Sequence, residues 1–437
     1  MTRDFHLFWT GQVTSAFGSG LTAIALPLVA VRYLDASPAE VGLLVAAGSL
    51  PLLLFGLLIA ACVDRLPRRR PYLIGCDLVA AAALACVMLG LAAGRMTVWG
   101  LGVFAFVLGV LGVIIETAYF VHLRSLIGDG DIVRARARLQ GGEHAGGVLG
   151  RVLSGPTVLV STVVPFLVDL ASYLVSALSL ALIKESEPRR PTGATGRVSW
   201  HELTAGLALL YREPFLSRLT PFVLGQQIVA GMILAALPSF LLTVLDVPTS
   251  LYGVMFVFLG VAAVAGTAVA SRLADRVEAR RLTVLAYLGV ALTTLLLPFA
   301  GGALPLAAGL AALGIGLPYF FGAIANIGLT AFVTVTVDEE KLGRAGVSLQ
   351  LVSVAALVVG SLVGGLLAQQ IGIRPTLWIA ALLSMTTLVV LWPMLRAGRR
   401  SASAPDEPMS GSEAARGGAA SAPATAPAPG VAVGELS

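Results

Sequence analysis

Four acidic residues and one arginine stand in or beside long apolar stretches, where they are suited to moving protons. The acids are Asp77, Glu116, Glu143 and Asp169, and the arginine is Arg151. Ionisable side chains inside a membrane are costly and therefore functional by default. We predict proton coupling by Asp77, Glu116, Asp169 and Arg151, with the arginine paired to Glu116 or Asp77 or meeting an anionic substrate group. Alternatively, Asp169 caps polar groups near the outer surface; Glu143 is interpreted as interfacial.

The elements that must position these residues are long apolar runs. The chain of 437 residues is 57% hydrophobic and 12% charged, whereas about a quarter of a soluble domain is charged. Runs of about twenty apolar residues can cross a hydrocarbon core about 30 Å thick, and in lipid they must be helical. Twelve spans are expected near 7–33, 40–63, 72–93, 98–121, 144–162, 164–183, 219–244, 251–271, 282–300, 304–333, 346–370 and 376–395. The predicted fold class is therefore an all-α membrane protein with twelve transmembrane helices.

The positive charges orient these spans. Cytoplasmic loops carry an excess of Lys and Arg. If the N-terminus is cytoplasmic, all of the 29 Lys and Arg lie on the cytoplasmic side except Arg32, Arg95, Arg151 and Arg374. Both termini are therefore expected in the cytoplasm of a cell-membrane protein. The net charge of +5 follows from this topology and does not indicate nucleic-acid binding. The three cysteines have no metal-ligand spacing, so no metal site is expected.

An internal repeat divides the chain. A shift of 211 residues aligns ALP at 25–27 with ALP at 236–238, and it aligns the scarce pair Asp64-Arg65 with Asp275-Arg276. The same shift pairs Leu34-Asp35 with Leu245-Asp246, Gly42 with Gly253, and Arg69-Arg70 with Arg280-Arg281. We predict two six-helix halves, 1–183 and 219–395, with a cytoplasmic linker at 184–218 and a disordered tail at 396–437. Trp200, Leu203, Leu207 and Leu210 predict an interfacial helix in the linker.

Several stretches resemble a known family. They are FHLFWTGQVTSAFGSGLTAIALPL at the start, ETAYFVHLRSLIG, LVDLASYLVSALSL, WHELTAGLALLYREPFLSR and LGRAGVSLQLVS. Together they resemble the major facilitator superfamily, and within it the branch of macrolide-efflux and enterobactin-exporter-like proteins. GRVLSGPTV is similar to an antiporter-type G-x-x-x-G-P pattern, although Arg151 replaces its first glycine. The resemblance implies a transporter.

The same resemblance implies a conformational latch in ACVDRLPRRR, which matches G-x-x-x-D-R-x-G-R-R at Asp64, Arg65, Arg68 and Arg69. The implied partner is the start of span eleven near 346–348, because a helix N-terminus attracts a carboxylate. A second copy keeps Asp275 and Arg276. The alternative is a loop whose arginines only orient the spans, which leaves Asp64 unexplained.

The superfamily also implies residues that line a substrate cavity. They are Gln12 and Ser15 in span one, Gln226 and Gln227 in span seven, and Tyr319, Phe320 and Asn326 in span ten. This set is mostly apolar or amide, which favours a lipophilic or amphipathic substrate over a sugar or a phosphate.

We therefore expect a monomeric proton-driven exporter of a drug, an antibiotic or a siderophore-like metabolite, without cofactor or enzymatic activity. No phosphate-binding loop precedes Lys184 or Lys341. One alternative is an importer on the same fold. The other is a membrane transferase, for which Asp129 and Asp131 would be an acidic pair, but a second acidic cluster is missing.

Overall fold

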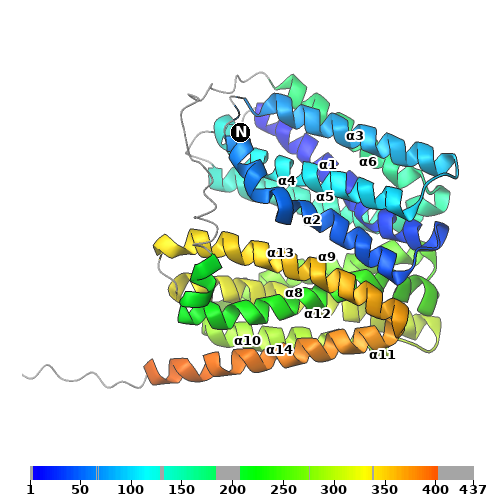
Figure 1. The fold of residues 1–437 in the computed structure, drawn as a ribbon. Coiled ribbons are helices and arrows are strands. Elements are labelled where there is room, and N and C mark those ends of the chain that lie inside the picture. Colours follow the sequence, from blue (N-terminus) through cyan, green and yellow to red (C-terminus); the bar gives the residue numbers. More distant parts are fainter. Residues whose placement is uncertain are drawn as a thin grey trace, which may run out of the picture. The chain divides into compact units, whose positions relative to one another are not determined.

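The structure, a computed structural model, describes residues 3–64, 66, 68–127, 132–183, 207–274, 276–336 and 339–401. The elements that it describes are helices (Figure 1). They are α1 Arg3–Tyr33, α2 Pro38–Asp64, α3 Arg70–Ala92, α4 Val98–Ile127, α5 Ile132–Val160, α6 Val164–Leu182, α8 Pro214–Ser239, the π-helix η1 Phe240–Val244, α9 Thr249–Ala274, α10 Ala279–Thr294, α11 Leu296–Phe299, α12 Leu304–Thr336, α13 Glu339–Gln370 and α14 Ile373–Ser401.

The helices agree with the predicted spans in order and roughly in number, but one of them, α5, is less apolar than the prediction assumed. Within the described chain, eleven helices are long and apolar enough to cross a membrane. The twelfth expected span lies in α5, which begins at Ile132 rather than near 144 and carries Arg134, Arg136 and Arg138 in its first turns. These charges lower its apolarity. It is nevertheless a full-length member of the bundle, because it packs along α1 and against α9.

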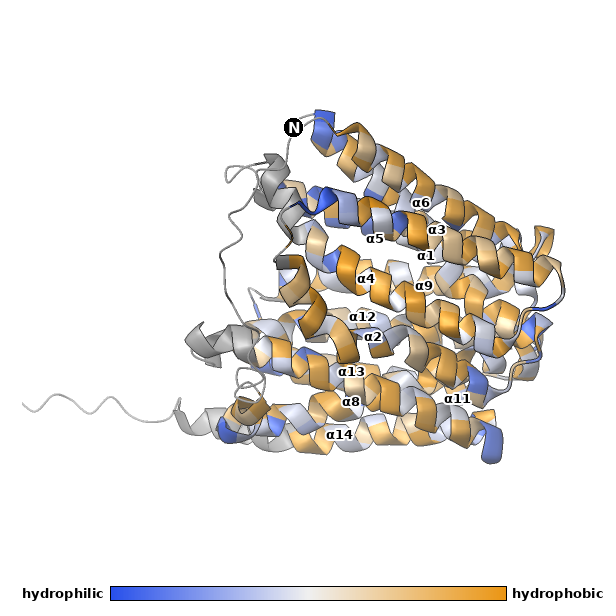
Figure 2. Ribbon diagram, turned by 45° about the horizontal axis from the view of Figure 1, so that its top comes forward, coloured by the Kyte–Doolittle hydropathy of each residue, from blue (hydrophilic) through white to orange (hydrophobic). Residues whose placement is uncertain are grey.

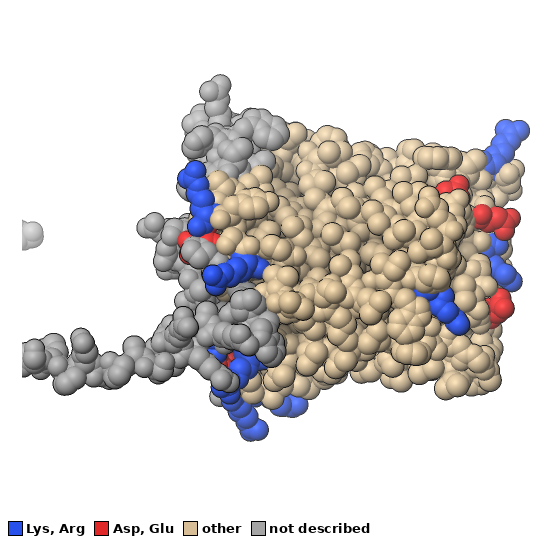
Figure 3. Space-filling view, turned by 60° about the horizontal axis from the view of Figure 1, so that its bottom comes forward, with Lys and Arg blue, Asp and Glu red and all other residues tan. Residues whose placement is uncertain are grey.

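Charge and hydropathy follow the helix ends. On the face shown in Figure 3, acidic and basic side chains gather at the two ends and leave an uncharged band between them. Figure 2 shows mostly apolar helices, with hydrophilic segments near their ends and along part of α5. An apolar band flanked by charged ends is what a bilayer requires.

The 211-residue repeat has a structural counterpart in two helix corners. Asp35 and Asp246 have φ of 51° and 48°, and they are the only non-glycine residues with positive φ in the described chain. At each corner an amide bonds back to the carbonyl six residues earlier, Ala36 to Ala30 and Val247 to Leu241, both at 2.9 Å. In both corners the residue just before this amide has the left-handed conformation that commonly ends a helix. Equivalent positions of the two halves therefore end their helices in the same way.

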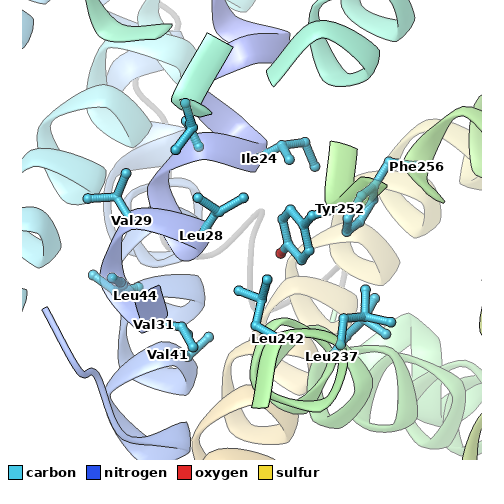
Figure 4. Close-up of a cluster of buried hydrophobic side chains, with 14 of the residues drawn as sticks. Ile24, Leu28, Val29, Val31, Val41, Leu44, Leu237, Leu242, Tyr252 and Phe256 are labelled. Atoms are coloured by element: carbon cyan, nitrogen blue, oxygen red, sulfur yellow. The ribbon is translucent and has the colours of Figure 1, made fainter. Parts of the chain in front are cut away.

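One apolar core joins the two halves at the helix ends that the charge pattern assigns to the outside. Figure 4 shows Ile24 and Leu28 of α1 beside Leu242 of η1 and Tyr252 of α9. Tyr252 and Leu28 are fully buried. Large side chains from both halves are buried at this boundary, and their van der Waals packing stabilises the contact.

Two glycine crossings bring the halves still closer near this core. In the first, α2 meets α13, and a Cβ added at Gly365 would lie 2.7 Å from the carbonyl oxygen of Pro38. In the second, α5 meets α9, and a Cβ added at Gly155 would lie 2.6 Å from the carbonyl oxygen of Thr249. Gly42 and Gly253, which the repeat pairs, each lie in one of these crossings.

At the opposite ends the halves have separate cores. Phe5, Phe8 and Leu73 belong to a cluster of the N-terminal half, and Leu219 and Phe222 belong to a cluster of the C-terminal half. These two clusters share no residue among those that the structure describes. Among the described residues, the halves thus share a core at one end, whereas each of these two clusters at the other end belongs to one half.

The structure describes only the end of the predicted linker and the start of the predicted tail. A helix is present from residue 207 to 212, whereas Trp200 and Leu203 lie outside the described residues. Leu210 is buried against Leu216 and Leu219, so the end of this segment packs on the C-terminal half and does not only lie along the membrane surface. Helix α14 continues to Ser401, and the predicted disorder of the tail from 396 onward stays a prediction.

Candidate functional site

Polar side chains form matching stripes on α1 and α6. On α1 they are Gln12, Ser15, Ser19 and Thr22, and on α6 they are Asp169, Ser172, Tyr173, Ser176 and Ser179. Steps of three and four residues place each set on one face of its helix. The two helices pack closely, and a Cβ added at Gly11 would lie 3.1 Å from the Cβ of Ser179. From these two stripes the sequence prediction included only Gln12, Ser15 and Asp169. The spacing of three and four residues could have indicated the other members.

Asp169 lies at the centre of this contact and is fully buried. Thr22 donates its hydroxyl hydrogen to Oδ2 of Asp169 at 2.5 Å. Ser172 Oγ lies 3.2 Å from Oδ1 but only 2.7 Å from the main-chain oxygen of Asp169. A hydroxyl has one hydrogen, so the shorter bond leaves Oδ1 weakly satisfied. Gly18 allows this approach, since a Cβ there would lie 2.5 Å from Oδ1 of Asp169.

Asp77 on α3 is 1% exposed and less well satisfied than Asp169. Neither carboxylate oxygen has a hydrogen bond of normal geometry with a described residue. The buried hydroxyl of Ser176 also lacks one, yet it lies close enough to interact with Asp77 and with Tyr119. Ser176 is therefore near Asp77 and Tyr119, but it forms no hydrogen bond of normal geometry with either of them. A buried carboxylate without a cation or a donor is costly unless it is neutral.

Tyr119 connects this interior to a pocket. Gln12 donates its amide hydrogen to the phenol oxygen of Tyr119, so this predicted cavity residue is held inside the N-terminal half and is only 4% exposed. The ring of Tyr119 packs edge-on against Phe8. Tyr119 also lines a pocket between α4 and α5.

The pocket has a volume of about 540 Å³ and carries both acidic and apolar groups. It is lined by Gly112, Ile115, Glu116, Tyr119, Arg136, Leu139, Gln140 and Glu143. Its size lies in the range of small-molecule sites. Glu116 is exposed in it, and its charge acts on Glu143. The interfacial interpretation of Glu143 is therefore incomplete, because Glu143 faces the same pocket as the predicted Glu116.

Arg151 faces the other half of the molecule. It is half-buried, and it forms no hydrogen bond or ion pair with any residue in the described ranges. Its charge acts on Tyr319 of α12. One turn further along α5, Gly155 contacts α9, and residues four apart share a helix face. The predicted pairing of Arg151 with Glu116 or Asp77 is thus absent from this conformation, because α5 turns the arginine toward α12.

The other predicted cavity residues divide into two groups. Gln226 is bonded within the C-terminal half, because its amide donates to Thr387 at 2.7 Å and lies 3.4 Å from Ser384 on α14. Tyr319 is 44% exposed, and Asn326 is also exposed. Ser15, Gln227 and Phe320 are half-buried. The exposed side chains of Tyr319 and Asn326 on α12 can therefore contact a ligand, whereas the amide of Gln226 is hydrogen-bonded to Thr387.

Only part of the predicted latch is described. Asp64 ends α2, but its side chain, Arg65 and Asp275 lie outside the described residues. Arg68 and Arg276 are exposed, and Arg69 is 4% exposed at the start of α3.

The predicted partner of the latch requires a correction. Helix α13 begins at Glu339, so 346–348 lie about two turns inside it, where amides are already bonded. The argument from a helix N-terminus therefore does not apply to 346–348. Val347 is 51% exposed, and no atom lies within 4 Å of a Cβ added at Gly346.

The helix bundle and its pocket define a class of protein: an α-helical membrane transport protein with two repeated halves. The sequence model of the Major Facilitator Superfamily matches residues 8–326, and the chain belongs to this family. Its members are generally transporters and not enzymes. A comparison with curated proteins finds no match.

Solved structures agree with the fold. The nucleoside transporter NupG is 14% identical, with a TM-score of 0.72 over 90% of this chain and 100% of that one. A bacterial homologue of the human lysosomal transporter Spinster, inward-facing and occupied, is 15% identical, with a TM-score of 0.68 over 90% and 96%. A bacterial metal transporter is 15% identical, with a TM-score of 0.61 over 90% and 98%. At such identities the likeness shows the fold alone.

Proposed function

We propose that this protein is a secondary active exporter of a lipophilic or amphipathic small molecule, driven by proton antiport with alternating access. One observation carries the proposal: among the described residues, the halves share a core at one set of helix ends and have separate clusters at the other, where a pocket of about 540 Å³ with two glutamates lies between α4 and α5. A closed end and an independently packed end are what one state of a rocking transporter requires.

The substrate class follows from the pocket lining. Ile115 and Leu139 offer apolar surface, whereas Glu116 and Glu143 offer negative charge to a donor or a cation on the ligand. Arg151 offers a positive group beside Tyr319. A lipophilic molecule with polar substituents suits such a set, as do the antibiotics and siderophore-like metabolites of the branch that the sequence resembles.

The remaining features of the proposal follow from its topology. With the positive loops inside, the joined core lies at the outer face of the cell membrane, both termini are cytoplasmic, and the described state is inward-facing. The two halves make a complete transport unit in one chain, so the proposed active form is a monomer. The latch of Asp64 and the basic residues after it would act at the cytoplasmic side, where the separate cores lie.

A resistance screen tests export. The protein is overexpressed or deleted across a panel of lipophilic antibiotics, dyes and metal chelators, and a compound whose tolerance rises and falls with the protein becomes the labelled probe. Right-side-out vesicles are then energised, and the direction of probe movement is measured with and without a proton uncoupler. Efflux that the uncoupler abolishes supports the proposal. Energised accumulation of the probe would establish the importer instead.

A further inference from the structure

Arg151 lies on the side of α5 that faces the interior between the halves. Leu149, Leu153 and Val160 are exposed apolar side chains on the other side of this helix, where lipid is expected. Seven residues, about two helical turns, separate Arg151 from Val158, which is 1% exposed in the core that joins the halves. Arg151 itself is half-buried. It therefore lies about two turns inward of the joined core, on the same face of α5.

Tyr319 has the corresponding position on α12. Ile315, about one turn nearer the start of the helix, is 4% exposed in the joined core, whereas Tyr319 is 44% exposed. Asn326, about two turns further along the same face, is also exposed. Burial therefore gives way to exposure along one face of α12, as it does on α5 between Val158 and the exposed His144. Both faces are accessible up to the level of the joined core.

Helix α9 holds these two faces beside each other, because it packs against both α5 and α12. A Cβ added at Gly253 would lie 2.9 Å from the carbonyl oxygen of Arg151, and one added at Gly316 would lie 3.1 Å from the carbonyl oxygen of Phe258. Gly253 and Phe258 are five residues apart, about 7.5 Å along α9. Tyr319 follows Gly316 by one turn, and an arginine side chain extends about 6–7 Å. Arg151 can thus direct its guanidinium toward Tyr319, in agreement with the action of its charge there.

Arg151 has no neutralising partner at this position. It forms no hydrogen bond or ion pair with a residue in the described ranges. The one acid on α5, Glu143, lies eight residues earlier, about 12 Å along the helix axis. A cation inside a membrane-spanning helix is costly unless it is paired or serves function. A guanidinium binds carboxylates and phosphates through paired N–H donors, and a phenol hydroxyl adds one more donor.

We propose that Arg151 and Tyr319 form a binding site for an acidic group of the substrate, at the closed end of the route between the halves. The transported molecule is then an amphiphile that carries a carboxylate, a sulfonate or a phosphate. The site takes one residue from each half, so it changes when the halves move. A glycine stands at the position of Arg151 in the antiporter-type pattern that GRVLSGPTV resembles, so the site belongs to this chain and not to that pattern. The inference rests on the proposed function and names its substrate class.

Thiol labelling of the full-length protein in nanodiscs of zwitterionic lipid tests the charge of the site without a transport assay. Gly322→Cys supplies the reporter after the native cysteines are replaced by alanine. No atom lies within 4 Å of a Cβ added at Gly322, which follows Tyr319 by one turn. Its reaction rate is measured with an anionic sulfonatoethyl and a cationic trimethylammonioethyl methanethiosulfonate. Arg151→Gln should lower the ratio of the anionic to the cationic rate by roughly tenfold, because the arginine attracts one reagent and repels the other.

Binding of an acid at the site is tested with 2-naphthoate and 2-naphthamide, which share one ring system and differ in charge. Naphthoate should slow labelling of the reporter while Arg151 is present, whereas naphthamide should not. The effect of naphthoate should be lost in Arg151→Gln. Arg151→Lys should keep the rate ratio but weaken the effect of naphthoate, because an ammonium group lacks the planar pair of donors.

Arg95→Gln, which removes an arginine from an expected outer loop, is the matched control and should change neither readout. A rate ratio that is unchanged in Arg151→Gln would overturn the site, and so would naphthoate that slows labelling no more than naphthamide does. If Arg151→Gln does not fold, Arg151→Lys carries the test, and an undiminished effect of naphthoate in that variant would count against the site. Neither readout needs export or a proton gradient, so a failure of the proposed antiport would be recognised separately in the vesicle assay.

Discussion

The acidic residues predicted from one criterion, burial in an apolar span, occupy different environments. Asp169 is fully buried and accepts a hydrogen bond from Thr22. Asp77 is buried without a hydrogen bond of normal geometry to a described residue. Glu116 is exposed in a pocket where it faces Glu143. The first two are therefore suited to holding protons away from substrate, whereas Glu116 is placed to contact a ligand.

At the same scale, Arg151 is expected to be required for transport. Arg151→Ala removes a half-buried cation whose charge acts on Tyr319 of α12, and we expect efflux to fall by roughly tenfold, because ionisable side chains inside membrane spans generally serve function. The measurement is the efflux rate of the probe found in the resistance screen. Arg95→Ala, in an expected outer loop, is the control. Wild-type efflux by Arg151→Ala would show that the arginine is dispensable.

Arg151 and Glu116 are expected to act independently. They form no ion pair, because Arg151 interacts with Tyr319 of the other half. Effects of groups that do not interact add in free energy. The double variant Arg151→Ala, Glu116→Gln should therefore lose the product of the two single losses in efflux rate. A double variant no worse than either single one would mean that the two residues pair in another conformation.

At the scale of elements, glycine decides where the halves can meet. Gly42 and Gly365 let α2 and α13 cross with backbone against backbone, and Gly155 and Gly253 do the same for α5 and α9. A side chain in such a crossing has no space, and overpacking costs about 1–3 kcal/mol. This cost applies only while the outer ends are joined.

Gly42→Val should therefore shift the protein toward a state with separated outer ends. Spin labels at Arg95 and Ala303, one in the expected outer loops of each half, report the change as a longer distance in pulsed dipolar spectroscopy after the native cysteines are replaced. Gly75→Val is the control, because no atom lies within 4 Å of a Cβ added at Gly75. An unchanged distance distribution in Gly42→Val would exclude this crossing as a determinant of the state.

At the scale of the molecule, the two halves are copies that share one end. The corners at Asp35 and Asp246 repeat the same backbone conformation, and the outer core draws large side chains from both halves. Among the described residues at the opposite ends, each half has an apolar cluster of its own. The alternating access that we propose would exchange contacts mainly at the glycine crossings.

Reporter fusions test the orientation of this assembly. A reporter active only outside the cytoplasm should be active after Arg95 or near 302 and silent in 64–70 or 272–281, because the arginines of the latter loops are held inside. Each fusion is also paired with a cytoplasm-active reporter, which should give the opposite pattern. Activity of the outside reporter in 64–70 would reverse the topology and would place the joined core on the cytoplasmic side.

The sequence by itself determined the membrane class, the order of the helices, the repeat and the identity of the buried acids. These properties depend on local composition: an apolar run must be helical in lipid, and a rare charge stands out within it. The repeat could be detected in the sequence because Asp and Arg are scarce in this chain, so their coincidence at a fixed shift is informative. The branch, the substrate and the direction of transport stay predictions, since residues common to the fold do not specify them.

Only the tertiary structure decided which of these residues meet. The amide of Gln226 bonds to α14 instead of facing a cavity, and Arg151 faces Tyr319 instead of an acid. Contacts of this kind depend on the rotation of each helix about its axis, which packing sets and composition does not. The hydroxyl of Thr22 was likewise ordinary in sequence. It became significant because Gly18 of α1 lets α6 approach closely enough to place Asp169 against it.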